Sequence, residues 1–498
     1  MEYFMNCNNA SLTAFSGNLD ANKAQHLYRR LGLSASIETI NAAVGRSASA
    51  VIDELINEAI NMPTTTEPEW AYWDRSNYPE DSDSRNPIVN AELEEWRLTY
   101  TTAILTNNLR DRLSFFWSNH FVTEVRNYNA PTYLFGYTNC LQRNAIGNFK
   151  TFTSEIGLDN AMLYYLDGAY NNSGNPNENY ARELYELFTL GEGNNYTEDD
   201  IIETARALTG YVERGDIQWS PVLFDESKFD ATDKTIFGQT ANFDYDGVID
   251  NLFTERGEES SWYICKKLYE FFVHPDSDDL ENNGNAAAVI DELAATFRAN
   301  DFEIAPVLSQ LFKSEHFFDD EAIGVIIKSP FDMFLNLINE TGFTYDDSIL
   351  ANVYSTSELL GQEVFNQPGV EGWYRNRQWI NNNYMIGRWL SCEMFLEIFY
   401  ENNDEEFFDF AVALTPNASG ENNPDVVATA ILNKMLPKGI ADDQLQIALD
   451  VFRDDSLANY YSPDGDSSWT LYNYADSSKQ QIYNLLLHII RQPEFQLK

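Results

Sequence analysis

The sequence predicts an all-α protein, a large multi-helix globular fold with a small irregular or β insert around residues 212–247. Three observations support this prediction. Apolar residues recur at helical spacing along most of the chain, between capping residues and glycine or proline stops. Hydrophobic residues make up 44% of the 498 positions and aromatic residues 14%, which is enough for a large core. The insert has short aromatic and β-branched pieces among turn residues, as hairpins do.

The N-terminal lobe, residues 20–211, is predicted to begin with a helix over 22–31, because Gly32 follows it as a C-terminal cap. Ser36 can cap a second helix, and apolar residues at helical spacing indicate a third between Val51 and Ile60. The remaining early segments are a loop at 63–90 and helical patterns at 91–121, 131–141 and 145–166.

A polar loop from Asp167 to Asn177 precedes the most highly charged helices of this lobe. Pro176 introduces a helix from Glu178 to Leu190, because proline is tolerated in a first helical turn. Thr197 is placed to cap the next helix, whose first turn holds three acidic residues that suit the positive end of a helix dipole.

The C-terminal lobe, residues 248–498, continues the helical pattern, and the chain shows no internal repeat. Its predicted helices are 247–273, 285–299, 304–313, 328–341, 351–360, 381–400, 404–413, 424–435, 441–452 and 478–492. Gly361 to Trp379 is a loop, and 415–423 and 461–477 are linkers. We expect both lobes and the insert to form a single domain over residues 1–498.

Net charge, hydropathy and the N-terminal residues limit the kinds of partner and the compartment that we expect. With 32 basic and 78 acidic residues the net charge is −46, which disfavours binding of nucleic acid. No segment reaches the roughly 18 apolar residues of a membrane span. The start has no basic and apolar signal, so the protein is expected to stay in the cytoplasm or to be exported by another route. Cys7, Cys140, Cys265 and Cys392 are far apart and form no C-x-x-C pair, which disfavours a zinc knuckle or a thioredoxin-type site. Cys265 and Cys392 lie in helical patterns and are expected to be buried thiols.

Charged residues gather beside apolar ones between positions 178 and 206. Such charges need partners, an ion or a ligand if they lie against a core. A structural polar network, in which carboxylates bind the planar guanidinium groups, is one interpretation. Its members would be Glu178, Arg182, Glu203 and Arg206, and we expect them to converge in the interior.

A catalytic centre is the second interpretation of the same region. One imidazole with two or three carboxylates in a helical bundle can hold iron, manganese or zinc. The divalent metal would bind His120, Glu183, Glu186 and Glu203, and the catalytic residues would be His120, Glu183, Glu186 and Arg182. The Glu-x-x-His pair typical of such sites is absent.

The loop from Gln367 to Trp379 is a further candidate site. Its aromatic and basic side chains can bind a sugar or a peptide, or can anchor a long loop to the core. The candidate ligand-binding residues are Trp373, Arg375, Arg377 and Trp379. The sequence has no nucleophile-elbow, P-loop or dinucleotide-binding motif.

Pieces spread over nearly the whole chain resemble the bacterial family known as domain of unknown function 1800. These pieces are Leu27–Gly32, Phe116–Phe121, Asn177–Leu184, Ala205–Tyr211, Asp233–Gly238, Ile327–Pro330, Pro368–Trp373 and Pro493–Leu497. The chain departs from the family at Ser34, where glycine is usual, and at Tyr211, where tryptophan is usual. The resemblance implies no activity. It implies a possible partner from a second family, 1501, which resembles sulfatases and alkaline phosphatases.

Two functions follow from these observations. The first is a binding or assembly protein that acts with a partner protein, since no known catalytic signature is present. The alternative is a metal-dependent hydrolase or oxidoreductase centred on His120 and the Glu/Arg cluster. The sequence leaves the oligomeric state open.

Overall fold

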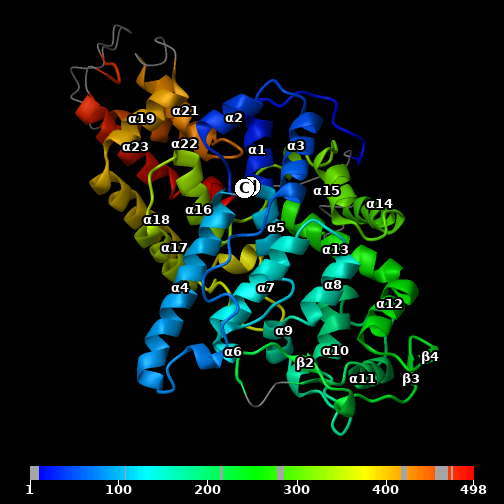
Figure 1. Ribbon diagram of the computed structural model, residues 1–498. Coiled ribbons are helices and arrows are strands. Elements are labelled where there is room, and N and C mark those ends of the chain that lie inside the picture. The colour runs from blue at the N-terminus through cyan, green and yellow to red at the C-terminus, as the bar shows by residue number, and fades with distance from the viewer. Residues whose placement is uncertain are drawn as a thin grey trace.

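Helices make up nearly all the regular structure of the protein, as predicted (Figure 1). The computed structural model describes residues 11–106, 108–212, 217–277, 285–416, 423–454, 469–472 and 475–498. The predicted linkers at 415–423 and 461–477 lie largely outside the described residues, and Cys7 lies wholly outside them. Cys265 and Cys392 are buried free thiols, as expected, and Cys140 is a third.

The first part of the chain forms a helical body in which α1 is buried along most of its length. Its helices are α1 (Ala21–Leu31), α2 (Ile37–Ala43), α3 (Ala48–Asn61), α4 (Ser82–Thr106), α5 (Asn108–Ser118), α6 (Val125–Tyr128), α7 (Pro131–Asn144), α8 (Phe149–Gly157), α9 (Asn160–Tyr165), α10 (Asn179–Glu183) and α11 (Glu198–Ala207). Short 3-10 turns lie at η1 (Arg75–Asn77) and η2 (Gly168–Tyr170).

Helix α10 continues into a π-helical turn, η3 (Leu184–Thr189). The N–H of Leu190 bonds the carbonyl of Tyr185 at 3.0 Å, five residues back. The wider turn changes the direction of the last carbonyl groups of this helix, a feature that recurs at functional sites.

The insert forms two small antiparallel sheets, which confirms the expected β character of this segment. β1 (Tyr211–Val212) pairs with β2 (Leu223–Phe224), and β3 (Lys234–Ile236) pairs with β4 (Gln239–Ala241). A 3-10 turn, η4 (Glu226–Lys228), follows β2. β3 packs against α11 and buries Lys234 and Ile236 on either side of exposed Thr235.

The rest of the chain is again helical. Its helices are α12 (Tyr245–Glu255), α13 (Gly257–Phe272), α14 (Ala286–Ala299), α15 (Ile304–Phe312), α16 (Pro330–Thr341), α17 (Asp347–Leu359), α18 (Asn382–Asn402), α19 (Glu405–Leu414), α21 (Pro424–Met435), α22 (Asp442–Asp454) and α23 (Ala475–Ile489). Short 3-10 turns lie at η5 (Asp320–Ala322), η6 (Asn376–Trp379) and η7 (Pro493–Gln496).

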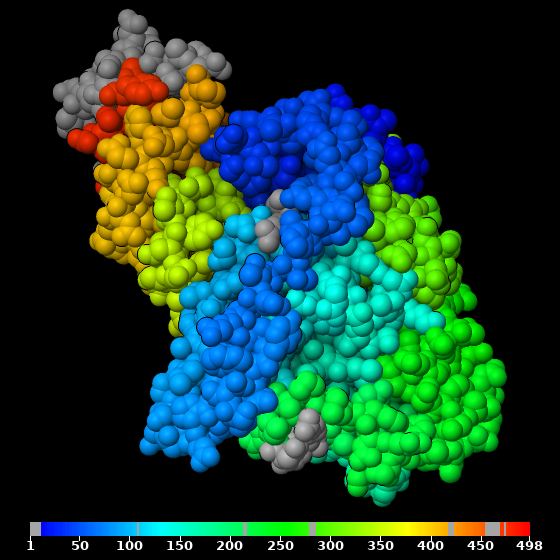
Figure 2. All heavy atoms as spheres, viewed as in Figure 1, coloured from blue at the N-terminus to red at the C-terminus, as the bar shows by residue number. Residues whose placement is uncertain are grey.

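Buried apolar residues from Leu12 to Phe495 form one continuous cluster. In Figure 2 the orange and red residues of the last helices project at one corner, beside the blue N-terminal helices. Residue Lys498 nevertheless lies in the middle of the molecule, where its backbone bonds that of Ile326 (Figure 1). The division into lobes at 20–211 and 248–498 stays a prediction.

Two segments differ from the prediction for local reasons. Residues 82–90 are the start of α4 and not a loop, because Asp81 accepts a hydrogen bond from the N–H of Ser84 and so caps the helix. The predicted helix over 247–273 is broken at Arg256, so that α12 and α13 are separate.

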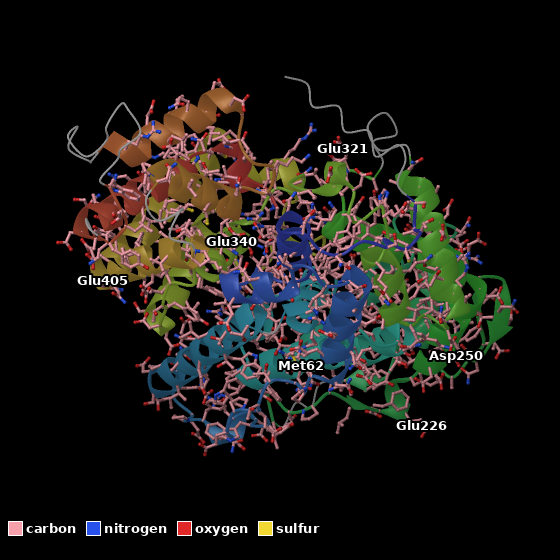
Figure 3. All side chains as sticks on the ribbon, turned by 90° about the horizontal axis from the view of Figure 1, so that it is seen from above. Met62, Glu226, Asp250, Glu321, Glu340 and Glu405 are labelled. Atoms are coloured by element: carbon pink, nitrogen blue, oxygen red, sulfur yellow. The ribbon has the colours of Figure 1, made fainter. Side chains whose placement is uncertain are left out.

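Several charged residues are buried with their partners. Figure 3 shows Glu340 among the central helices, whereas Glu226, Asp250 and Glu405 lie at the periphery. Glu340 has no exposed surface and is 2.6 Å from Arg29 of α1. A buried carboxylate requires such a partner, because burial without one is very unfavourable.

Candidate functional site

The charges around Arg182 form ion pairs at the surface. Arg182 lies 3.2 Å from Glu178, 3.3 Å from Glu186 and 2.8 Å from Glu198. The side chain of Arg182 is 32% exposed and that of Glu198 is 70% exposed. The expectation that this region converges in the interior is therefore wrong. The helix turns its apolar residues inward and leaves the charges at the edge.

The charges around Arg206 form a second group. Arg206 is 2.6 Å from Glu203 and 2.9 Å from Asp230. Glu203 also accepts a hydrogen bond of 3.1 Å from the backbone N–H of Thr235. Among the described residues no ion pair joins this group to Arg182. The group therefore fastens the insert to α11.

The structure does not gather the residues predicted to bind a metal. In the part of the chain that is described, no three His, Cys, Asp or Glu side chains lie together as a metal site would require. Glu186 and Glu203 are each bound to an arginine. Burial and the nearby Glu186 raise the pKa of Glu183 to about 7. His120 belongs to a different place.

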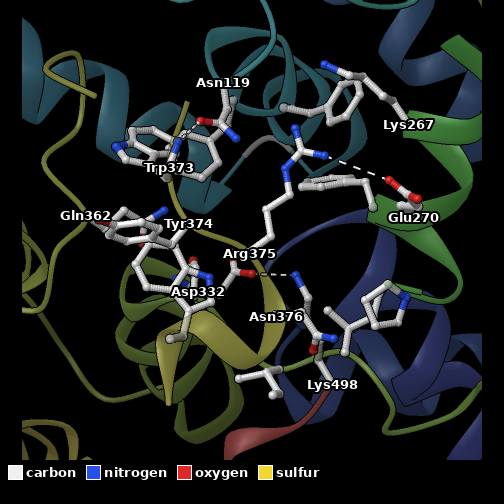
Figure 4. Close-up of a pocket in the computed structure, with 18 of the residues that line it drawn as sticks. Asn119, Lys267, Glu270, Asp332, Gln362, Trp373, Tyr374, Arg375, Asn376 and Lys498 are labelled. Carbon is white, nitrogen blue, oxygen red and sulfur yellow. Dashed lines mark hydrogen bonds and ion pairs between the residues drawn. The ribbon is translucent and has the colours of Figure 1, made fainter. Parts of the chain in front are cut away.

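His120 lines a cavity of about 130 Å³ together with three of the four predicted ligand-binding residues, of which Figure 4 labels Trp373 and Arg375. These three are Trp373, Arg375 and Trp379. Arg377 is exposed and does not line the cavity. The volume is well above the roughly 15 Å³ that one water molecule needs, so a small organic group has room.

Aromatic rings from three segments form the apolar wall. Phe115 of α5 lies 5.2 Å, between ring centres, from Trp373 of the loop. Phe116, also of α5, lies 4.9 Å from Phe271 of α13. Such walls bind flat or apolar ligand groups.

The loop that carries Trp373 is held firmly against α5. The backbone N–H of Trp373 donates to Asn119 Oδ1 at 2.7 Å, and its indole N–H donates to the Glu363 carbonyl at 2.9 Å. Gly372 has a φ of +89°, which other residues rarely adopt. Trp373 is thus both an anchor of the loop and part of the cavity wall.

The floor of the cavity carries a buried carboxylate between two cations. Asp332, in the first turn of α16, receives hydrogen bonds of 2.5 and 3.0 Å from Arg112. Lys498 Nζ also bonds Asp332 (Figure 4). Burial alone would raise the pKa of Asp332, but Arg112 and Lys498 hold it well below its usual range. Burial and the nearby Arg112 lower the pKa of Lys498 to about 7.

Arg375 stands at the mouth of the cavity. Its side chain is 48% exposed and lies 3.8 Å from Glu270 of α13 (Figure 4). This distance is longer than a normal hydrogen bond. The guanidinium group is therefore only loosely held by Glu270.

His120 and Lys267 form a polar pair on the cavity wall. His120 Nε2 lies 3.0 Å from the Phe188 carbonyl, which can only accept, so Nε2 carries the proton. Nδ1 is then an acceptor, and Lys267 Nζ donates to it at 3.1 Å. Burial and Lys267 hold the pKa of His120 well below its usual 6.5. Burial and Arg375 hold the pKa of Lys267 well below its usual 10.5.

The end of the π-helical turn supplies the carbonyl groups that position this pair. The last carbonyls of a helix lack helical partners. Here the Phe188 carbonyl is bonded by His120, and the Leu187 carbonyl by Tyr263 at 3.0 Å and Lys267 at 3.5 Å. One helix end thus fixes two polar groups of the cavity.

A larger groove of about 1490 Å³ adjoins the cavity. The two share Lys267, Glu270, Trp373, Tyr374 and Arg375. Acidic residues also line the groove, namely Glu192, Glu258, Glu259 and Glu371. The cavity therefore opens to the outside past Arg375.

Sequence reasoning missed Lys267, Asp332 and Arg112. Each is a charged residue in a predicted helix with apolar residues nearby, for example Lys267, which lies next to Leu268 and two positions after Cys265. A charge at such a position is a usable signal, because it must find a partner or a ligand once the helix is packed.

Comparison with known proteins agrees with the resemblance seen in the sequence. Among the described residues, no helix is long and apolar enough to cross a membrane. No curated protein and no solved structure matches the chain. The family model described as a protein of unknown function (DUF1800) matches residues 26–497, nearly the whole chain. The chain therefore belongs to the DUF1800 family.

Proposed function

We propose that this protein is a binding protein whose cavity holds a small organic anion with an apolar or aromatic body. Its charge balance is the observation that carries the proposal. Four basic side chains line the cavity, against two acidic ones: Arg112, Lys267, Arg375 and Lys498 against Asp332 and Glu270. The basic groups still outnumber the acidic ones when Lys267 is neutral. In a chain with a net charge of −46, such an excess of basic groups in one cavity favours an anion.

Arg375 is the side chain best placed to bind the anionic group. A guanidinium group can bind a carboxylate through two parallel hydrogen bonds. Arg375 lies at the entrance, and its contact with Glu270 is long enough to be exchanged for a ligand. The aromatic rings of Phe115 and Trp373 line the same cavity and suit the body of the ligand.

Isothermal titration calorimetry with phenylacetate and phenylacetamide tests the proposal. These probes have nearly the same shape and differ in charge. We expect phenylacetate to bind at least about tenfold more tightly, which corresponds to one good charge-assisted hydrogen bond. Equal affinity for the two probes would contradict the proposal.

Two arginines of the same loop provide a matched pair of variants. Arg375→Gln should remove the preference for phenylacetate, because Arg375 lines the cavity. Arg377→Gln should leave the preference unchanged, because Arg377 is exposed and does not line it. If both variants behave alike, Arg375 is not the anion-binding group.

That the protein acts in an assembly with a partner protein stays a prediction, and the partner is the one that the family resemblance implies. A protein of the sulfatase-like family 1501 stays a predicted partner. No observation on the described residues favours the metal-dependent alternative.

A further inference from the structure

The cavity contains a lysine that forms no ion pair with any carboxylate of the described residues. Lys267 Nζ contacts His120 Nδ1 at 3.1 Å and the Leu187 carbonyl at 3.5 Å. The other lysines nearby differ in this respect. Lys266 lies 3.9 Å from Glu270, and Lys498 is bound to the carboxylate on the cavity floor.

We propose that Lys267 is a nucleophilic amine that forms an imine with the carbonyl carbon of a 2-oxo acid held in the cavity. A neutral amine has two N–H bonds and one lone pair. The two acceptors around Lys267, His120 Nδ1 and the Leu187 carbonyl, take both N–H bonds. The lone pair is then left free to react.

The surroundings favour the neutral amine. Burial and the positive charge of Arg375 both lower the pKa of Lys267. Desolvation and a neighbouring cation are the two means by which proteins activate a lysine for attack on a carbonyl group. His120 is an acceptor at Nδ1 because the Phe188 carbonyl fixes its tautomer.

The step is balanced without any oxidant or reductant. The Nζ lone pair forms a bond to the carbonyl carbon, and the C=O π electrons move to oxygen, which takes a proton. That proton is one of the two on Nζ, and the second Nζ proton passes to the same oxygen as the carbinolamine loses it as water and forms C=N. Water reverses the reaction and releases the ligand.

The choice of a 2-oxo acid rests on the proposed function. The carboxylate would meet Arg375, and the adjacent carbonyl carbon would face Lys267, which lines the same cavity. An apolar or aromatic side chain would contact the rings of Phe115 and Trp373.

Reductive trapping tests the inference on the full chain. The protein is incubated with phenylpyruvate and sodium cyanoborohydride, and the adduct is located by peptide mass spectrometry. We expect one adduct, on Lys267, at a level at least about tenfold above that on Lys266, which is its neighbour on the same helix. Adducts spread over several lysines, or none on Lys267, would overturn the inference.

Variants and a competitor separate this inference from the proposed function. Lys267→Arg should abolish the adduct and Lys266→Arg should keep it, with thermal unfolding used to check that each variant folds. The mapping in the wild type holds even if Lys267→Arg is unstable. If phenylacetate binds but no adduct forms, the inference fails alone. A different result would affect only the proposed anion preference. This result is that phenylacetaldehyde labels Lys267 as well as phenylpyruvate does, and that added phenylacetate does not protect Lys267 from labelling.

Discussion

Asn119 and Trp373 are joined by a 2.7 Å hydrogen bond from the backbone N–H of Trp373 to the side-chain oxygen of Asn119. This bond ties the end of α5 to the loop before η6. It is possible only because the preceding residue has no side chain. A Cβ at Gly372 would lie 2.4 Å from Asn119 Oδ1 and 2.8 Å from its carbonyl oxygen.

Gly372→Ala should therefore displace the loop and weaken ligand binding. Strain at a positive φ costs about 1–3 kcal/mol, so we expect phenylacetate affinity to fall roughly tenfold or more, by calorimetry. Gly369→Ala is the matched control, because a Cβ at Gly369 meets nothing within 4 Å. Similar affinities for the two variants would show that the loop does not shape the cavity.

Asp332→Asn should destabilise the protein strongly. The substitution leaves two buried cations, Arg112 and Lys498, without their carboxylate. Loss of one partner from a buried charge pair costs about 3–5 kcal/mol, measurable by urea unfolding at neutral pH. Because the folded protein holds the pKa of Asp332 low, the wild type has this contribution at neutral pH and loses it as the pH falls into the acid range.

A surface acid serves as the control for this experiment. Asp450 lies 3.5 Å from Arg453, and its side chain is 64% exposed. Asp450→Asn should change the free energy of unfolding by less than about 1 kcal/mol. If Asp332→Asn has an equally small effect, the charge cluster on the cavity floor is not coupled to stability.

Surface and buried ion pairs of arginine should contribute differently to the free energy of unfolding. Arg182→Ala breaks only surface ion pairs and should cost less than about 1 kcal/mol. Arg29→Met leaves Glu340 buried without its closest partner and should cost about 3 kcal/mol or more. Denaturant unfolding measures both. A large effect of Arg182→Ala would restore the view that the charges near position 182 form an essential centre.

Asp159 should give the free energy of unfolding a pH dependence opposite to that given by Asp332. Burial raises its pKa from the usual 3.8 to about 7. Between these two values the folded protein binds a proton that the unfolded chain has released, so the free energy of unfolding falls as the pH rises to 7 and then levels off. Asp159→Asn should be more stable than the wild type at pH 8, by on the order of 1–3 kcal/mol, and nearly equal to it at pH 4.

Urea unfolding of Asp159→Asn at both pH values gives the answer. Asparagine can keep the cap of α9, because the side-chain oxygen that accepts from the Ala161 N–H is retained. Asp320→Asn, at a side chain that is 86% exposed, is a suitable control and should show no such crossover. A loss of stability at pH 8 in Asp159→Asn would contradict the prediction.

The helices could be predicted from the sequence because their signals are local. The helix predicted to begin near residue 328 is α16, where the Ser329 hydroxyl accepts from the Asp332 N–H at 3.1 Å and Pro330 occupies the first turn. Thr197 caps α11 in the same way. The start of α4 was missed because its cap, Asp81, lies in a stretch rich in proline and serine that resembles a loop.

The candidate site could be predicted only in pieces. His120 and Trp373 were each noted, but nothing local relates residues that are so far apart in the chain. The charges near Arg182 lie at the surface although their spacing also fits a buried cluster, because spacing alone does not tell whether a helix edge faces the core or solvent. Lys267 could not be predicted because its partner is an imidazole in the turn after α5, far away in the chain, and not a neighbouring acid.

The π-helical turn at Leu184–Thr189 makes the site depend on chain length as well as on residue identity. Deletion of one residue there would allow ordinary winding, but would rotate the carbonyls that follow by about 100°. His120 and Lys267 would then lose the oxygens that orient them, although every cavity side chain would still be present. In a relative of this protein, the spacing between the Asn-Glu-Asn-Tyr segment and the glycine at 191 would therefore be as informative as the side chains themselves.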